Sequence, residues 1–277
     1  MSEGKAFLFK FVLSSCISTL FNPFLFVQSI LFLGQIVALF RCPSKQPATE
    51  DMSTRIIYRL PFQGKWKVVN GGITPETSHS WNLPNQRYAY DFVKERGDIG
   101  VGQITGNNDL DTYPSFGQAI LAPADGTIVS VRDGQRDCPW PGTGAVDVLC
   151  KDVRGNYVVI RHLNNEFSLL AHLRLGSVKV AVGQEIITGQ KIGECGNSGH
   201  STEPHLHFHI QDRQSFFVSS SKPINWGQFR RMCGDTDGDS FLTRGDKVES
   251  LDDANATISP AALNYVEYDQ GKVAKNE

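Results

Sequence analysis

The stretch GECGNSGHSTEPHLHFHI, residues 193–210, decides the fold and the candidate site of this chain. Its last six residues alternate strictly between histidine and an apolar side chain, which is the period of a β-strand. We therefore expect His205, His207 and His209 on one face of this strand and the three apolar residues on the other. The apolar face requires a hydrophobic core. Three imidazoles on the opposite face, behind a glycine-rich loop, indicate a metal site with a general acid or base beside it.

The rest of the folded part repeats the strand pattern. Short alternating runs, such as residues 126–132, 156–161 and 167–172, are separated by Gly, Pro, Asn and Asp from about residue 58 onward. No long amphipathic helix interrupts them. The pattern predicts an all-β fold, and 277 residues are enough for a real core.

The N-terminal residues 6–40 are apolar with only scattered polar side chains, which predicts a membrane segment. A span needs about 20 residues, so this run is long for one helix and short for two. Two interpretations stay open, a single span near residues 20–40 or a tight hairpin hinged at Asn22 and Pro23. We expect an anchor over 1–41, a tether over 42–60, a folded domain over 61–215 and a C-terminal extension over 216–277 that packs on the domain or trails from it.

Charge and cysteine usage exclude two classes of function. The net charge is −2 and basic residues are not clustered in the folded part, which argues against a nucleic-acid partner. None of the six cysteines falls in a C-x-x-C pair, which argues against a thiolate zinc site of the usual spacing. Cys138 and Cys150 flank a Pro/Gly-rich turn, where they can form a disulfide or remain two buried thiols.

Several short blocks together resemble the lysostaphin-like zinc endopeptidases, which cut peptides of peptidoglycan. The blocks are YAYDF at 88–92, APADGT at 122–127, LAHL at 170–173, GNSG at 196–199 and HLHF at 205–208. They occur in the family's order, and the resemblance covers roughly residues 68–212. It implies a mostly antiparallel β-sheet or open barrel with a substrate groove, one zinc ion per chain and a peptidoglycan peptide as substrate.

The resemblance also implies roles for individual residues. Asp91 and His207 match two of the family's zinc ligands, and His172 and His205 match the pair that activates water and stabilises the developing oxyanion. Three protein ligands leave zinc one open position for water, and the metal lowers the pKa of that water to about 7. A neighbouring imidazole can then accept its proton.

One position departs from the family pattern. The family places its first histidine four residues before the aspartate, and here that position is Arg87, which cannot bind zinc. We expect His79, displaced upstream in the loop 77–84, to be the third ligand, as in a branch of the family with such a displaced histidine. His209 is a second candidate. In the other interpretation the site is degenerate and the domain binds the cell wall or a partner without cutting.

The remaining polar motifs have less specific interpretations. His162 is expected to be structural and His200 to be a solvated loop residue, whereas Asn197 and Ser198 are expected to line the groove and contact the substrate. Residues 235–246 place acids at positions 1, 3, 5 and 12 of a calcium-loop template, but the glycine at position 6 is missing. A turn with a closing strand explains the same pattern.

Together these observations predict a membrane-anchored, zinc-dependent peptidoglycan endopeptidase. Residues 6–40 are its expected membrane contact, and the catalytic domain is expected on the extracytoplasmic side of the cell membrane, where the substrate is. The alternative is a catalytically inactive cell-wall-binding or regulatory domain of the same fold.

Overall fold

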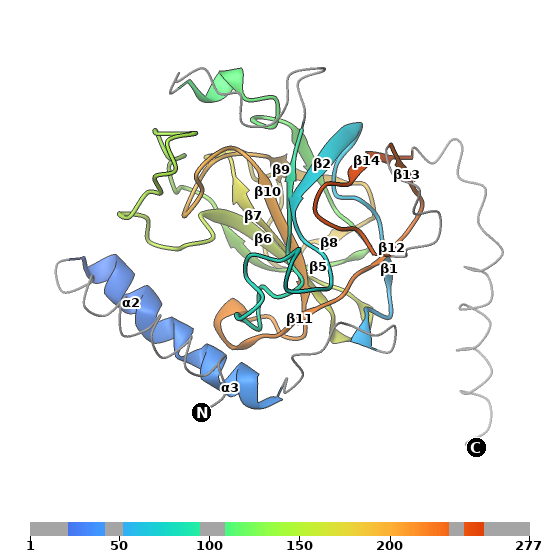
Figure 1. Cartoon of the computed structure of the whole chain (residues 1–277), viewed down its shortest axis with the longest axis horizontal. Helices are drawn as coiled ribbons and strands as arrows, with labels where there is room; N and C mark the ends of the chain where they lie inside the picture. Colours follow the sequence, from blue (N-terminus) through green and yellow to red (C-terminus); the bar gives the residue numbers. More distant parts are fainter. Residues whose placement is uncertain (1–21, 42–51, 95–108, 233–240, 252–277) are drawn as a thin grey trace.

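The computed structural model describes residues 22–41, 52–94, 109–232 and 241–251 of the chain. Figure 1 shows a β-rich body with one apolar helical segment lying along its outside. The predicted all-β, antiparallel fold is therefore confirmed for the body.

Most of the described strands form one large sheet of ten strands. Its order is β13 (Phe229–Arg231), β14 (Lys247–Ser250), β2 (Lys65–Asn70), β3 (Tyr90–Val93), β10 (Leu206–Gln211), β7 (Phe167–Leu173), β6 (Asn156–Arg161), β5 (Gly126–Arg132) and β8 (Glu185–Ile186), with β11 (Ser221–Lys222) also paired to β10. Every pair in this sheet is antiparallel. Among the described strands the sheet stays open, since β13 and β8 at its two ends do not pair with each other.

Smaller elements complete the body. β4 (Ala119–Leu121) pairs with β9 (Lys191–Glu194), and β1 (Ile57–Tyr58) pairs in parallel with β12 (Asn225–Trp226). Three short 3-10 helices are η2 (Leu110–Thr112), η3 (Leu163–Asn165) and η4 (Phe216–Val218).

Residues 53–60, at the end of the expected tether, contact the body. Thr54 donates its backbone N–H to the carbonyl of Pro223 at 2.9 Å, and Tyr58 is fully buried. The Tyr58 hydroxyl donates to the buried Glu166 carboxylate, which also accepts from the backbone of Arg55 and from Lys222. Burying this tyrosine and satisfying this carboxylate require that residues 53–60 be part of the folded body.

Strand β10 occupies the centre of the sheet, and both of its faces are buried. Leu206, Phe208 and Ile210 lie in the main core, as the alternating sequence predicts. The histidine face is covered by a second apolar cluster, which includes Val159, Leu169, Ala171, Phe216 and Phe32. This second cluster brings the N-terminal helix against the body.

The helical segment consists of α2 (Pro23–Phe32) and α3 (Gly34–Arg41). Asn22 caps α2, because its side-chain oxygen accepts the backbone N–H groups of Phe24 and Leu25, and Pro23 takes the first helical position. The structure therefore begins a helix at Asn22 and Pro23. The residues that decide between one span and a hairpin, 1–21, lie outside the described part of the chain.

This segment packs on the body through its polar side chains. Gln28, Ser29 and Gln35 are buried, and the Gln35 side chain donates to the carbonyl of Phe217 at 2.9 Å and accepts the backbone N–H of Asn85 at 3.0 Å. The outward face instead carries large apolar side chains: Phe24, Phe26, Val27, Ile30, Leu31, Leu33, Ile36, Val37 and Phe40 are exposed. This arrangement is the reverse of a helix on a water-soluble surface.

Candidate functional site

Asp91 and His207 face each other across neighbouring strands. They are directly paired in the register of β3 and β10, so their side chains project from the same face of the sheet. The distance from His207 Nδ1 to Asp91 Oδ1 is 2.9 Å, and both side chains are nearly buried. The pairing of the two strands thus joins two of the predicted ligands.

The displaced histidine also reaches this carboxylate. His79 Nδ1 lies 3.7 Å from Asp91 Oδ2, and the His79 side chain is 56% exposed. Asn70, at the end of β2, binds both partners, since its Nδ2 donates to Asp91 Oδ2 at 3.1 Å and its Oδ1 accepts the backbone N–H of His79 at 2.8 Å. Sequence reasoning missed Asn70, although the following Gly71 and Gly72 marked a turn there.

Arg87 has a structural role in the loop that carries His79. Its Nε donates to the carbonyl of Trp81 at 3.0 Å, and its guanidinium lies 5.4 Å from the centre of the Trp81 ring. The residue that replaces the family's first histidine therefore helps to hold the loop from which His79 approaches Asp91.

His172 and His205 form a second pair beside the first. Their ring centres are 4.8 Å apart, and His205 Nε2 lies 3.7 Å from Asp91 Oδ1. His172 Nδ1 is 2.7 Å from the carbonyl oxygen of Ser198, and His205 Nδ1 is 2.8 Å from that of Glu203. Because a carbonyl only accepts, both Nδ1 atoms carry hydrogen, and in the neutral rings each Nε2 has a free lone pair.

A β-bulge aims His172 into the site. The register between β6 and β7 shifts between Asn156 and Val158, and His172 has a φ of +60°. This left-handed conformation is rare for a residue other than Gly, Asn or Asp, and such strain is concentrated at functional sites. The bulge places His172 out of strict strand alternation, which no pattern in the sequence showed.

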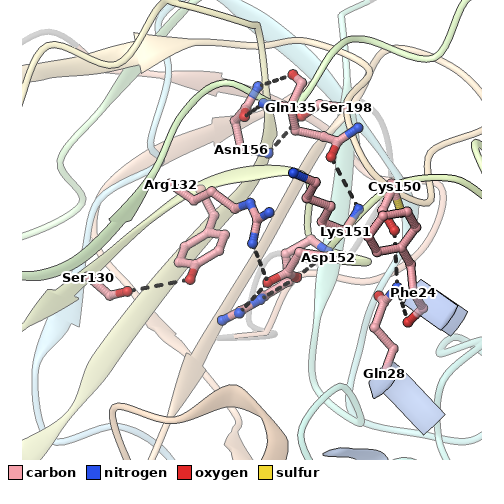
Figure 2. A network of polar contacts seen from close by, with 12 residues as sticks. Phe24, Gln28, Ser130, Arg132, Gln135, Cys150, Lys151, Asp152, Asn156 and Ser198 are labelled. Carbon is pink, nitrogen blue, oxygen red and sulfur yellow. Dashed lines mark hydrogen bonds and ion pairs between the residues drawn. The ribbon is translucent and has the colours of Figure 1, made fainter. Parts of the chain in front are cut away.

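The loop at 196–199 holds the Ser198 carbonyl in place beside His172. The Ser198 hydroxyl donates to the carbonyl of Leu173 at 2.7 Å. It also accepts the backbone N–H of Asn156 at 2.9 Å, within the network that Figure 2 shows. Asn197 and Ser198 are both fully buried. The expectation that they line the groove is wrong, because both side chains hold the loop in place from inside.

A buried chain of side chains fixes the orientation of His207. Gln211 Nε2 donates to the carbonyls of Arg213 and Gln214 at 2.7 and 3.1 Å, so its oxygen faces His209 Nε2 at 2.9 Å. His209 Nε2 must then carry hydrogen, and its Nδ1 accepts from His207 Nε2 at 3.1 Å. The lone pair of His207 Nδ1 consequently points at Asp91 Oδ1.

The contact between His207 and Asp91 shows whether these residues fit a metal ion. Two acceptors, His207 Nδ1 and Asp91 Oδ1, lie 2.9 Å apart, and such contacts are stable only when a cation, a proton or a metal ion, lies between them. One carboxylate and two imidazoles are also ligands that zinc accepts. As placed, no group of three or more His, Cys, Asp or Glu side chains in the described residues surrounds a common metal position. The donor set fits zinc in kind.

Electrostatics keeps this cluster partly neutral. Burial would raise the pKa of Asp91, but the adjacent His207 ring and the nearby imidazoles lower that pKa below its ordinary value. Burial lowers the pKa of His172 well below its usual range and that of His209 to about 3. Asp91 is therefore ionised and these two histidines are neutral near pH 7, as metal binding and proton acceptance require.

A cavity of about 210 Å³ adjoins the cluster. His172, His207 and His200 line one side, and α2 contributes Gln28 and its neighbours. Leu83 and Gln86 also line it. The loop predicted to supply His79 therefore continues directly into residues that line the cavity.

Other predicted motifs stay apart from the cluster. His162 is buried and structural, since it bonds the carbonyl of Asp125 and the hydroxyl of Ser168 at 2.7 and 2.9 Å. Cys138 and Cys150 are buried free thiols. Most of the calcium-like motif lies outside the described residues, and Asp246 instead forms an ion pair with Arg231 at 3.1 Å.

Part of the chain matches a known protein family. Residues 105–222 match the sequence model of Peptidase family M23. This range contains His172, His205 and His207 but begins after Asp91 and His79, which are near the Arg87 departure.

Two curated relatives illustrate the similarity. Peptidoglycan DD-endopeptidase ShyA of Vibrio cholerae is 26% identical over 63% of this chain and 30% of its own length. Murein hydrolase activator NlpD of Escherichia coli is 33% identical over 38% of this chain and 23% of its own length. The chain thus spans less than a third of these relatives.

Among solved structures, a zinc-containing peptidase from Vibrio cholerae is 21% identical, with a TM-score of 0.31. The alignment covers 63% of this chain and 37% of that one.

Proposed function

Because the chain carries a Peptidase family M23 domain, we propose that it is a zinc-dependent endopeptidase that hydrolyses peptide bonds in peptidoglycan. The observation that supports this proposal most is the convergence of three imidazoles on one carboxylate. His79, His205 and His207 all lie within 3.7 Å of Asp91, although His79 precedes it in a loop and the other two come from a strand far along the chain. A structural β-sheet has no need for this arrangement.

In this proposal His79, Asp91 and His207 hold the ion. When bound, zinc lowers the pKa of a coordinated water to about 7 and polarises a carbonyl. Asn70 would restrain both Asp91 and the His79 backbone, and the His209–Gln211 chain would keep the His207 lone pair directed at the ion.

His172 and His205 supply the proton transfers. Each presents Nε2 with a free lone pair, because each Nδ1 is held by a backbone carbonyl. Burial favours the neutral form of His172, which suits it to accept a proton from the attacking water. His205, closer to the Asp91 carboxylate, is placed to donate a hydrogen bond to the developing oxyanion once it is protonated.

The N-terminal helix would hold this domain at the outer surface of the cell membrane. By length and composition, Pro23–Phe40 is apolar enough to cross a membrane, and its large apolar side chains face away from the body. The same helix binds the body through Gln28 and Gln35. We propose that the catalytic domain is held against the lipid surface by these contacts.

A second candidate function is supported by the absence of a closed three-ligand group in the described residues. In that case the domain would bind peptidoglycan or regulate another hydrolase, and the NlpD similarity agrees with such a role. The two functions differ in whether His79 completes a zinc site.

Zinc content and peptide release together test the proposal. We expect the full chain in detergent to hold about one zinc and to release peptide ends from purified peptidoglycan. His79→Ala should lose both zinc and activity, whereas His205→Ala should keep zinc and lose activity. Retention of zinc by His79→Ala would show that another residue is the third ligand, and His209→Ala would be the next variant to measure. A wild type that holds no zinc and releases no peptide would favour the second function.

A further inference from the structure

Two of the residues that line the cavity beside the proposed catalytic histidines each carry a buried polar atom with no hydrogen-bond partner among the described residues. One is Oε1 of Gln28, on α2, and the other is Nε2 of His200, on the loop that follows the glycine-rich turn. Gln28 is only 3% exposed. Buried polar atoms are nearly always satisfied, so two unpaired ones on the walls of one cavity indicate a polar ligand.

The Gln28 side chain is held in a fixed orientation. Its Nε2 donates to the carbonyl of Cys150 at 3.2 Å and to that of Phe24, one turn earlier in the same helix, as Figure 2 shows. Because both contacts are carbonyls, the amide group cannot be flipped without facing oxygen toward oxygen. The Gln28 oxygen is therefore left as an acceptor without a donor among the described residues.

His200 supplies a complementary group. Its backbone N–H donates to the carbonyl of Val153 at 2.9 Å, which fixes the loop beside the cavity. Burial lowers the pKa of His200, so the ring is neutral and its Nε2 can carry a hydrogen to donate. The expectation of a solvated loop histidine is wrong, because this ring lines the cavity and its Nε2 is buried.

We propose that this cavity is a subsite for the main chain of the peptide substrate, bound by Gln28 of the N-terminal helix and by His200. A peptide main chain offers one donor and one acceptor per residue, which matches an acceptor and a donor on the cavity walls. The volume of about 210 Å³ is below the roughly 300–1,000 Å³ of sites for drug-sized ligands, so it suits a short segment of peptide. The inference rests on the proposed peptidase function and makes the helix part of the substrate site.

The test measures binding rather than turnover. The full chain in detergent carries His205→Ala, so that the peptide is not consumed, and the probe is a soluble cross-linked stem-peptide dimer prepared from peptidoglycan. In this background Gln28→Met removes the acceptor at nearly constant length, and His200→Phe removes the ring nitrogens. Each should weaken binding about fivefold, the usual effect of losing one hydrogen bond. His200→Gln, which keeps a donor, should bind more tightly than His200→Phe.

Gln35→Met is the matched control. Gln35 is equally buried on the same helical segment and also binds backbone groups of the body, but it does not line the cavity. The control should bind the dimer like the parent. Equal weakening in all variants would assign the effect to helix packing and overturn the subsite. So would undiminished or tighter binding by Gln28→Met and His200→Phe, the result expected of a helix that blocks the site.

The outcomes also separate this inference from the proposed function. If the parent binds the dimer in a Gln28-dependent way but the wild type cuts no peptidoglycan, the subsite stands and the reaction is rejected. If the wild type cuts and the two variants bind like the parent, the subsite alone is rejected. No binding by the parent rejects the subsite whatever the wild type does.

Discussion

At the scale of single residues, the orientation of the candidate site residues depends on buried groups behind them. His207 is directed by His209 and Gln211, His172 by the carbonyl of Ser198, and His79 by Asn70. Outer partners of this kind fix the tautomer and the position of a ligand, and their loss typically costs about 10–100-fold in metal affinity or activity.

Replacing Gln211 tests the chain behind His207. Gln211→Leu removes the acceptor that keeps hydrogen on His209 Nε2, so His209 and His207 can exchange tautomers and the His207 lone pair is no longer held toward Asp91. We expect zinc affinity, measured by competition with a chelator, to fall about tenfold or more. Gln214→Leu is the control. The Gln214 side chain is exposed and donates to the Val129 carbonyl, and it takes no part in the hydrogen bonds that link Gln211, His209 and His207. Equal affinities for the two variants would contradict the role of Gln211.

Ser198 allows a residue-scale test of His172. Ser198→Ala deletes the hydroxyl that links Leu173 and Asn156, and so frees the carbonyl that holds His172 Nδ1. We expect kcat for peptide release to fall about tenfold while zinc content stays unchanged, because His172 is not one of the proposed ligands. Loss of zinc in this variant would show that His172 or its loop supports the metal directly.

At the scale of elements, close backbone approaches position the glycine-rich loop. A Cβ added at Gly196 would lie 2.4 Å from the Cα and N of Arg174, whereas one added at Gly193 would make ordinary contacts of 3.5 Å and more. The backbone cannot yield as a flexible side chain can. The loop therefore packs against the end of β7 only without a side chain at position 196.

The two glycines form a matched pair for measurement. We expect Gly196→Ala to lower the free energy of unfolding by about 2–4 kcal/mol, and Gly193→Ala by less than about 1 kcal/mol. Denaturant unfolding of the two variants checks this difference. Similar values would mean that the loop can shift away from Arg174.

The helical segment of α2 and α3 buries polar side chains and exposes apolar ones, the reverse of a helix on a water-soluble surface. Its buried face carries Gln28 and Gln35, and its exposed face carries Val27 and Val37, each 54% exposed. In the proposed function this outward face contacts lipid, since apolar area removed from water contributes roughly 25 cal/mol per Å².

Charging that face should weaken membrane binding. We expect Val27→Glu combined with Val37→Glu to reduce co-sedimentation with lipid vesicles at least tenfold, because carboxylates are costly in the apolar layer. Val182→Glu, at a valine that is 64% exposed on the body, should leave binding unchanged. Full vesicle binding by the double variant would place the membrane contact in another part of the chain.

At the scale of the whole molecule, several histidines are buried in a neutral form. Burial lowers the pKa of His162, His172, His200 and His209 in the folded chain. In the unfolded chain each returns to about 6.5. Between the lower folded pKa and 6.5 the unfolded state binds more protons than the folded state. The free energy of unfolding is therefore highest above about pH 6.5 and decreases as the pH falls.

The acid sensitivity can be measured through His162, which lies apart from the proposed metal site. We expect the wild type to lose stability below about pH 6.5, by up to about 1.4 kcal/mol per pH unit for each buried histidine. His162→Gln, which can still bond the Asp125 carbonyl or the Ser168 hydroxyl, should show a shallower slope in denaturant titrations from pH 7 to 5. Parallel slopes would show that His162 does not titrate on unfolding.

The sequence by itself determined the strand at 205–210 and the antiparallel β fold, and its motifs marked Asp91, His172, His205 and His207 as candidates for the site. It could do so because strand alternation and short motifs are local. It also indicated an apolar N-terminal segment, but not that this segment turns its glutamines toward the body. Side-chain order along a helix shows which residues share a face, and only the packed structure shows what that face contacts.

The tertiary structure alone decided the rest of the site. The pairing of β3 with β10 sets Asp91 opposite His207, the bulge turns His172 inward, and Asn70 brings the loop of His79 to Asp91. The cavity shared by Gln28 and His200 likewise joins residues that are far apart in the chain. Register, bulges and loop packing depend on long-range contacts, and these leave little trace in any short stretch of sequence.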